Sequence, residues 1–248
     1  MNGLVILAAA LLPAILLLYY IWRKDPYKEP VGWLAKAFLW GVAIVIPISV
    51  VETAIGAVLF GDGGPTSLVD TTVLSFAVAA LPEESFKLLA LWLVLRRNPY
   101  FDEHFDGIVY AVFVSLGFAA VENVGYVFTQ DDWVTTAAMR ALLAVPGHYA
   151  FAILMGYYYS VHHFVDRSQG VALRILLVPV VAHGIYDSIA MSGMVSPVVG
   201  GIAFFLLVYF CVRMHKYAKT KMLAQIEHDR REREHAAAGL MDDVPFGK

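Results

Sequence analysis

Three charged side chains lie together in an otherwise apolar stretch, LPEESFKLLALWLVL at 81–95. On a helix, Lys87 is spaced i,i+4 from Glu83 and i,i+3 from Glu84, so its ammonium can reach either carboxylate. An internal ion pair that locks a bundle needs only one glutamate. Paired carboxylates kept from water are typical of general acid–base chemistry, so the second glutamate favours a chemical role.

Polar side chains recur in the following apolar stretches. Glu122, Asn123 and, one turn later, Tyr126 lie in GFAAVENVGYVF at 117–128. Asn and Tyr often join membrane helices by hydrogen bonds, so a polar clamp between helices and a direct part in chemistry both remain open. His148 follows a Pro-Gly pair inside its apolar stretch, where an imidazole is either a hydrogen-bonded packing residue or a functional one.

His183 and Asp187 occur one turn apart in VPVVAHGIYDSIAMSG at 178–193. On a helix this i,i+4 pair shares one face, so the carboxylate can orient the imidazole or bind a metal with it. The plainer alternative is a pair that satisfies only itself.

The charges in these stretches do not balance. Four carboxylates face a single ammonium: Glu83, Glu84, Glu122 and Asp187 against Lys87. Full ionisation would leave an excess of about three negative charges in a low-dielectric interior, which is very costly. Either some carboxylates are protonated, or a cation such as Zn²⁺ supplies the balance. Both alternatives describe a hydrolytic site in which a glutamate deprotonates a water. The predicted ligands of such an ion are His148, His183 and Glu84.

The composition restricts the class of protein. Of the 248 residues, 59% are hydrophobic and 16% are charged, against about 25% charged in a typical soluble domain. The mean hydropathy is +0.65. These values exclude an ordinary cytosolic enzyme. The net charge of −3 and the lack of a basic domain give no footprint for nucleic acid, and a single cysteine, Cys211, excludes an internal disulfide.

The elements that carry these residues are predicted to be membrane helices, because about 20 apolar residues span a bilayer. We therefore expect an all-α, polytopic bundle of about seven transmembrane helices. The predicted spans are 3–22, 33–59, 68–95, 106–129, 135–160, 171–193 and 197–215.

The positions of Lys and Arg predict the orientation, since short cytoplasmic loops carry these residues in excess. Lys and Arg follow the first, third, fifth and seventh spans, whereas the loops between carry none. The N-terminus is therefore expected outside and the C-terminus in the cytoplasm. We expect a transmembrane domain at 1–215 and a charged cytoplasmic tail at 216–248, which begins as a solvated helical extension and is disordered over its end, 236–248.

The ordered set of motifs resembles the PrsW family of bacterial intramembrane proteases. That resemblance rests on Glu83-Glu84-x-x-Lys87, Glu122-Asn123-x-x-Tyr126, His148 and His183-x-x-x-Asp187 on successive helices, with DPYKEP at 25–30 and FLWG at 38–41. The family is related to the CAAX prenyl endopeptidases and to bacterial immunity-type membrane proteases. In the prenyl proteases the paired-glutamate motif ends in Arg, so Lys87 favours the PrsW family.

The resemblance implies a multi-pass protein of the bacterial plasma membrane that hydrolyses a peptide bond in or near the membrane segment of a membrane-anchored substrate. By the same resemblance, the substrate is an anti-sigma factor cut on its extracytoplasmic side, and the lipid bilayer is the other partner. The family is described as a metalloprotease, whereas a glutamate-only mechanism is argued for its relatives. The implied catalytic residues are Glu83, Glu84, His148, His183 and Asp187, with Lys87, Glu122, Asn123 and Tyr126 in support.

Two other classes of function use the same residues. Buried Glu, His and Asp are also typical of proton- or cation-coupled transporters, although these usually carry inverted repeats and paired broken helices, which this sequence lacks. A catalytically inactive membrane scaffold is the third alternative.

Overall fold

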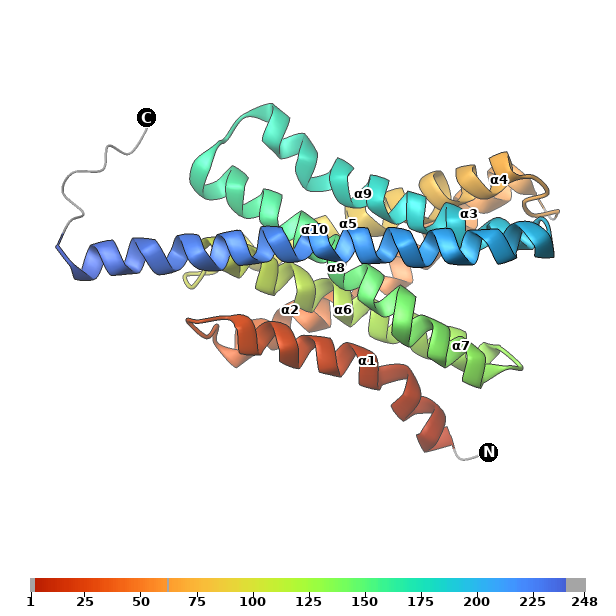
Figure 1. Cartoon of the computed structure of the whole chain (residues 1–248), viewed down its shortest axis with the longest axis horizontal. Coiled ribbons are helices and arrows are strands. Elements are labelled where there is room, and N and C mark those ends of the chain that lie inside the picture. The colour runs from red at the N-terminus through yellow and green to blue at the C-terminus, as the bar shows by residue number, and fades with distance from the viewer. Residues whose placement is uncertain (1–2, 62, 240–248) are drawn as a thin grey trace.

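The structure is a computed structural model that describes residues 3–61 and 63–239, and every regular element in that part is a helix (Figure 1). The predicted all-α class is therefore confirmed. In chain order the segments are α1 (Gly3–Lys24), α2 (Val31–Ala43), α3 (Val45–Phe60), α4 (Leu68–Val73), η1 (Leu74–Ala80), α5 (Leu81–Leu95), α6 (His104–Thr129), α7 (Trp133–Met139), η2 (Arg140–Ala144), α8 (Val145–Ser160), η3 (Val161–Val165), α9 (Gln169–Met191), η4 (Ser192–Met194) and α10 (Pro197–Ala237).

Six helices are long and apolar enough to cross a membrane, and they correspond to six of the seven predicted spans. They cover Gly3–Lys24, Val31–Phe60, His104–Thr129, Trp133–Val165, Gln169–Met194 and Val198–Ala237. The remaining predicted span, 68–95, is the continuous run α4–η1–α5. That run carries Asp70 and the three charges at 83–87, which interrupt its apolar character.

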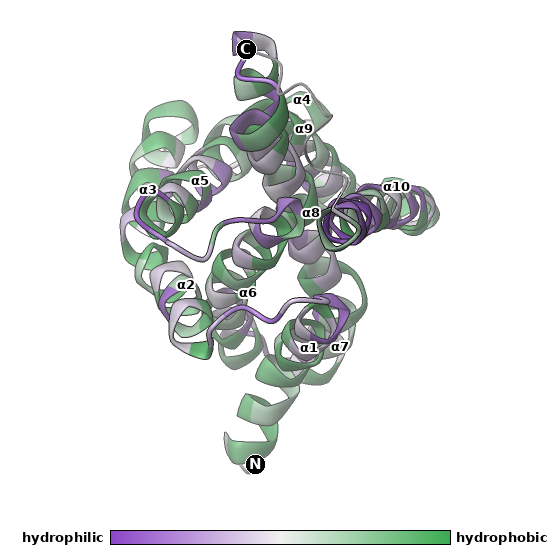
Figure 2. Ribbon diagram, turned by 90° about the vertical axis from the view of Figure 1, so that its left-hand side faces the viewer, coloured by the Kyte–Doolittle hydropathy of each residue, from purple (hydrophilic) through white to green (hydrophobic). Residues whose placement is uncertain are grey.

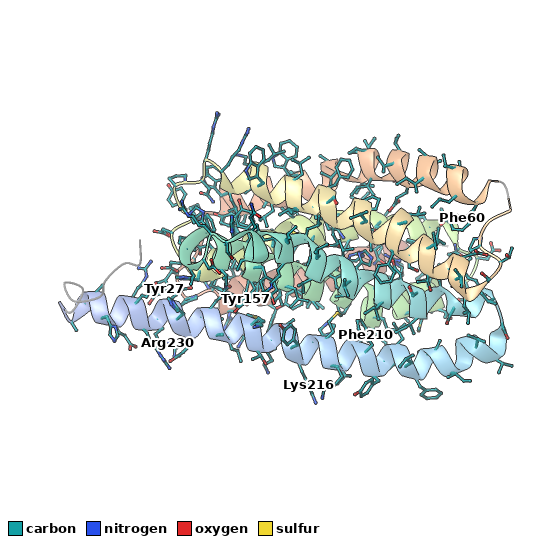
Figure 3. All side chains as sticks on the ribbon, turned by 90° about the horizontal axis from the view of Figure 1, so that it is seen from above. Tyr27, Phe60, Tyr157, Phe210, Lys216 and Arg230 are labelled. Atoms are coloured by element: carbon teal, nitrogen blue, oxygen red, sulfur yellow. The ribbon has the colours of Figure 1, made fainter. Side chains whose placement is uncertain are left out.

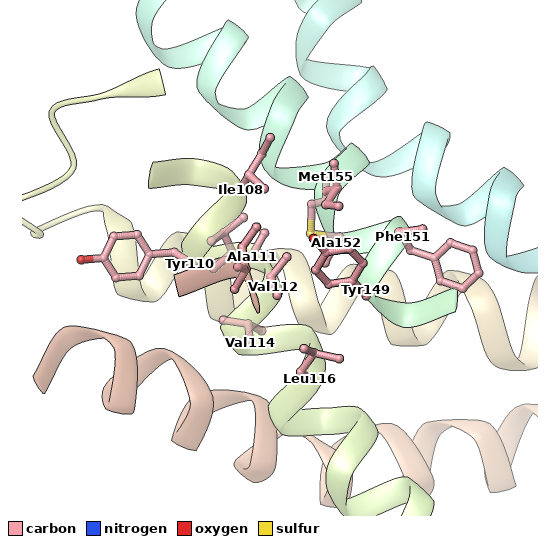
Figure 4. Close-up of a cluster of buried hydrophobic side chains, with 14 of the residues drawn as sticks. Ile108, Tyr110, Ala111, Val112, Val114, Leu116, Tyr149, Phe151, Ala152 and Met155 are labelled. Carbon is pink, nitrogen blue, oxygen red and sulfur yellow. The ribbon is translucent and has the colours of Figure 1, made fainter. Parts of the chain in front are cut away.

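Helix α6 is the central element of the bundle. It packs against α8, α2 and α1, and most of its side chains are buried. Figure 4 shows part of this core, where Ile108, Val112 and Leu116 of α6 lie near Tyr149 and Met155 of α8. The outer helices instead turn large apolar side chains outward, as lipid contact requires.

Glycines allow the central helices to approach closely. A Cβ at Gly156 of α8 would lie 2.3 Å from the carbonyl oxygen of Gly107 on α6. A Cβ at Gly117 of α6 would lie 2.2 Å from the carbonyl oxygen of Phe38 on α2. Both contacts are with backbone, which cannot rotate away, so these helices touch only because the side chains are absent.

We predict that Gly156→Ala destabilises the bundle by about 1–3 kcal/mol, because the added methyl forces α6 and α8 apart. The matched control is Gly125→Ala, where a Cβ meets nothing within 4 Å. Unfolding of both variants in detergent micelles checks this. Equal stabilities would contradict the close contact.

The loops that carry Lys and Arg lie at one end of the bundle. The α1–α2, α5–α6 and α8–α9 connections and the C-terminal part of α10 lie there, whereas the beginning of α1 and the α6–α7 and α9–α10 connections lie at the other end (Figure 1). In Figure 2 the first of these ends faces the viewer, and its loops are more hydrophilic than the helices behind them. This segregation is consistent with the predicted orientation, which stays a prediction.

Helix α10 continues without a break through residue 215 to Ala237. Its extension is helical, as predicted, but it is not solvated on every side, because Met222, Gln225 and Asp229 are buried against the bundle. Gln225 donates to the carbonyl of Tyr157 at 3.3 Å, and Figure 3 shows Tyr157 close to this helix. The predicted disordered end lies, from residue 240 on, outside the described residues.

The DPYKEP segment forms an ordered turn between α1 and α2. The carboxylate of Asp25 accepts the backbone N–H groups of Tyr27 at 2.9 Å and of Glu29 at 3.3 Å. The Tyr110 hydroxyl of α6 donates to the Glu29 carboxylate. Burial raises the pKa of Glu29 to about 7, and the nearby Asp25 acts in the same direction.

Because the folded-state pKa of Glu29 lies above its ordinary value of 4.5, its contribution to stability is complete below pH 4.5 and is lost as the pH rises to about 7. We therefore expect the unfolding temperature in detergent to fall across that window. Glu29→Gln, which keeps an acceptor for Tyr110, should make the fall shallower. An unchanged pH profile would contradict the assignment.

Candidate active site

The polar residues of four helices converge on one cavity of about 620 Å³. The predicted residues that line it are Glu83 of α5, Glu122 and Tyr126 of α6, His148 of α8, and His183 and Asp187 of α9. Glu84, Lys87 and Asn123 are also buried and lie behind the lining. The structure thus brings eight of the nine predicted site residues into one connected group around the cavity, and the ninth, Asn123, joins it through Arg140.

A π-helical segment followed by a proline precedes two of these residues. The π-helical segments η1 and η2 end just before Pro82 and Pro146, respectively. Proline has no N–H to donate to the carbonyl four residues earlier, so one backbone hydrogen bond of the helix is missing. A π-helical turn accommodates this interruption. Glu83 follows the first proline directly, and His148 follows the second by two residues. The sequence therefore places a break in the helix at each point where a polar side chain must enter the cavity.

Lys87 stands at the centre of the buried group. Its Nζ lies 2.9 Å from Oε2 of Glu83 and 2.8 Å from Oε1 of Glu84, as the spacing predicted. It also lies 3.2 Å from Nδ1 of His148 and 4.4 Å from the ring centroid of Phe118. One ammonium therefore binds both glutamates and ties α5 to α8.

The contacts of His148 define its protonation pattern. An ammonium can only donate, so Nδ1 of His148 accepts from Lys87, and the ring proton is on Nε2. Nε2 lies 3.0 Å from Oε2 of Glu122 and donates to it. His148 therefore links the α5 charges to the α6 carboxylate.

His183 lies between two carboxylates. Its Nδ1 is 3.0 Å from Oε1 of Glu84, and its Nε2 is 3.2 Å from Oδ2 of Asp187. The ring stacks on Phe151 with centroids 4.7 Å apart. Each ring nitrogen faces a carboxylate, which suits an N–H donor at both positions. The pair of His183 and Asp187 is therefore not isolated, because Glu84 also contacts the ring.

Arg140 is a residue of this site to which the sequence analysis assigned no role. Its guanidinium donates to Oε2 of Glu122 at 2.7 Å and to Oδ1 of Asn123 at 2.6 Å, and it lies 4.0 Å from the ring centroid of Tyr126. The expectation that the four carboxylates face only Lys87 was wrong. Counting Arg140 lowers the predicted excess of negative charge by one.

Asn123 is a clamp between helices. Its amide donates to the carbonyl of Ala10 on α1 at 2.5 Å, while its oxygen accepts from Arg140. It does not line the cavity. Glu52 of α3, by contrast, does line it. This fifth carboxylate offsets Arg140, so the formal excess is again about three negative charges.

One group lining the cavity has the donors of a metal centre. Glu83, His148 and His183 each offer a ligand atom, and these atoms lie within 4.8 Å of one another. One carboxylate and two imidazoles are the protein ligands of several catalytic zinc sites. The donor set therefore fits such an ion, with Glu83 in the place that the sequence assigned to Glu84.

Comparison with known proteins gives the family. A family model described as "PrsW family intramembrane metalloprotease" matches residues 29–214. The chain belongs to the PrsW family. It is therefore an intramembrane protease, as the resemblance implied, and a multi-pass protein of the cell membrane.

Several curated PrsW proteins are similar over most of their length, each named "Protease PrsW". The Oceanobacillus iheyensis protein is 37% identical over 186 residues, which is 74% of this chain and 82% of that protein. The Geobacillus kaustophilus protein is 35% identical over 189 residues, 75% and 80% of the two chains. The Bacillus subtilis protein is 34% identical over 226 residues, 89% and 99%. No solved structure matches this chain.

We predict that Lys87→Met destabilises this PrsW protein by about 3–5 kcal/mol, because two buried carboxylates lose their counter-charge. The control is Lys36→Met, whose ammonium lies at the exposed surface over Trp33. Adding Glu84→Gln to Lys87→Met should recover part of the loss, since one uncompensated charge is removed. Unfolding in detergent measures all three variants, and equal stabilities of the two lysine variants would exclude a central role for Lys87.

Proposed function

We propose that this protein cuts a membrane-anchored anti-sigma factor with a water activated by Glu83. The carrying observation is that, of the paired glutamates, Glu83 lines the cavity, whereas Glu84 does not. One oxygen of Glu83 is held by Lys87 at 2.9 Å. This arrangement fixes the carboxylate and presents it to a water in the cavity.

In the proposed step, Glu83 takes a proton from the water, and the water oxygen adds to the carbonyl carbon of the substrate. The carbon–nitrogen bond then breaks, and the proton held by Glu83 passes to the leaving nitrogen. Donors that line the cavity stabilise the oxyanion in between. The neighbours with suitable groups are Arg140 and Tyr126.

Glu84 has a positioning role in this proposal. It accepts from Lys87 at 2.8 Å and faces Nδ1 of His183 at 3.0 Å. It therefore holds the ring of His183 in the cavity wall, while Asp187 orients the same ring from its other nitrogen at 3.2 Å.

A bound Zn²⁺ is part of the proposal, on the strength of the family description and of the donor set. His148 and His183 would hold it, and Glu83, the third member of the group, would stay beside it as the base. When bound, such an ion supplies a Lewis acid that polarises the substrate carbonyl. The two ring nitrogens of His148 contact Lys87 and Glu122, and those of His183 contact Glu84 and Asp187. Binding of the ion would therefore replace one of these contacts at each ring.

The place of the cavity supports a cut on the extracytoplasmic side. Its lining includes Met191, Gly193 and Gly200 around the α9–α10 turn. This turn lies at the end of the bundle away from the Lys and Arg loops (Figure 1). Under the predicted orientation that end faces outward, as the resemblance implied for the cut.

The proposed function is tested by incubating the purified protein in proteoliposomes with a panel of single-pass anti-sigma factors. Glu83→Gln should lower the cleavage rate by about 10²–10⁴-fold, the usual contribution of a general base. The control is Glu227→Gln, an exposed glutamate of α10 that pairs with Arg231 at 2.9 Å. Mass spectrometry of the fragments locates the bond.

Cleavage by Glu83→Gln at the wild-type rate would refute the proposed base. Cleavage of other membrane proteins but no anti-sigma factor would refute the proposed substrate alone.

Removal of metal is the second test of the proposal. Treatment with a chelator should abolish cleavage, and added Zn²⁺ should restore it. His148→Ala should bind less Zn²⁺ than wild type. Full activity after complete removal of metal would leave Lys87 as the cation beside Glu83 and would refute the zinc part.

A further inference from the structure

A second group of histidines and carboxylates lies at the end of the bundle that carries the Lys and Arg loops. His104 begins α6, and the other three members, His228, Asp229 and Glu232, come from the extension of α10. His104 and Asp229 are buried, whereas His228 and Glu232 are exposed. The three α10 residues lie beyond residue 214, where the PrsW family match ends.

The spacing of the four ligand atoms suits a tetrahedral ion. Nδ1 of His104 lies 3.0 Å from Oδ1 of Asp229 and 3.7 Å from Oε2 of Glu232. Nδ1 of His228 lies 3.6 Å from the same Glu232 oxygen. Ligands bound at 2.0–2.1 Å in a tetrahedron lie about 3.3 Å apart. The three distances given are within about 0.4 Å of this spacing, and all four ligand atoms lie within 4.8 Å of one another.

Asp229 is already held in position without an ion. Its Oδ1 accepts the backbone N–H of His104 at 2.9 Å, and its Oδ2 accepts that of Phe105 at 2.8 Å. Asp229 thus binds the first turn of α6, where a negative charge is favoured. Because the buried half of the group is fixed, an ion would have to order only His228 and Glu232.

The charges of the group match a divalent ion. Two carboxylates give two negative charges, and two neutral imidazoles add none. The arginines on the same part of α10 are engaged elsewhere. Arg233 pairs with Glu103, and Arg230 and Arg231 both pair with Glu227. Imidazole with carboxylate is a donor set that suits Zn²⁺.

We propose that His104, His228, Asp229 and Glu232 form a divalent transition-metal site, separate from the cavity, that clamps the C-terminal extension of α10 to α6. When Nδ1 of His104 binds the ion, the ring proton that faces Asp229 moves to Nε2 by exchange with water, so the imidazole stays neutral. The clamp acts on the helix whose earlier part, at Ala203 and Leu207, lines the cavity.

The proposal is tested by Zn²⁺ titration of the full-length protein in detergent micelles, with calorimetry and elemental analysis. The double variant His228→Ala/Glu232→Ala removes two exposed ligands and leaves the buried contacts of Asp229 intact. Its control is His235→Ala/Glu227→Ala, which removes one histidine and one glutamate of the same helix outside the group. The double variant should lose one equivalent of Zn²⁺, and the control should lose none.

Amide hydrogen exchange gives a second readout. Zn²⁺ should slow exchange over residues 216–237 in wild type and in the control, and should leave it unchanged in the double variant. The same Zn²⁺ stoichiometry in all three proteins would overturn the proposal and show that the group is a hydrogen-bonded contact only. Loss of the equivalent without any change in exchange would overturn the clamp.

Discussion

Lys87 places one ammonium against two carboxylates and an imidazole inside a bundle whose outer surface is apolar. An unpaired charge in such surroundings is prohibitively costly, so the ammonium and the glutamates can be buried only together. The three residues occupy successive turns of one helix, and the geometry of α5 alone creates the pair. Every other polar contact of the cavity is added around this unit: His148 binds the ammonium, and His183 binds the second glutamate.

A helix that carries such a unit must also open toward a cavity. The chain achieves this with a π-helical segment and a proline before Glu83, and with a second such combination before His148. The breaks are tolerated because the neighbouring helices are in close contact. Gly107 and Gly156 allow close contact between α6 and α8. This contact holds the two helices together although backbone hydrogen bonds are interrupted just before α8.

Length and hydropathy were sufficient to predict the helices, because the membrane fixes how many apolar residues a span needs. Because burying a charge has a large free-energy cost, the charged residues in apolar stretches could be predicted to lie around a common site. The partner of Glu122 was not predictable. Arg140 lies in η2, beyond α7, and its contact with Glu122 depends on how these helices pack. Nor could the sequence decide which of two adjacent glutamates lines the cavity, because consecutive helical residues point about 100° apart and only the packing selects one.

The extension of α10 was misread for a related physical reason. A mixed run of Lys, Arg, Glu and Asp is typical of a solvated helix, and most of its charges are indeed exposed. Asp229, however, accepts two backbone N–H groups at the start of α6, which would otherwise have no partner within that helix. A buried helix terminus requires an acceptor, and here a distant part of the chain supplies it. The same helix therefore contacts the cavity with its apolar half and the opposite end of the bundle with its polar half, so the two ends of the molecule are joined by one continuous element.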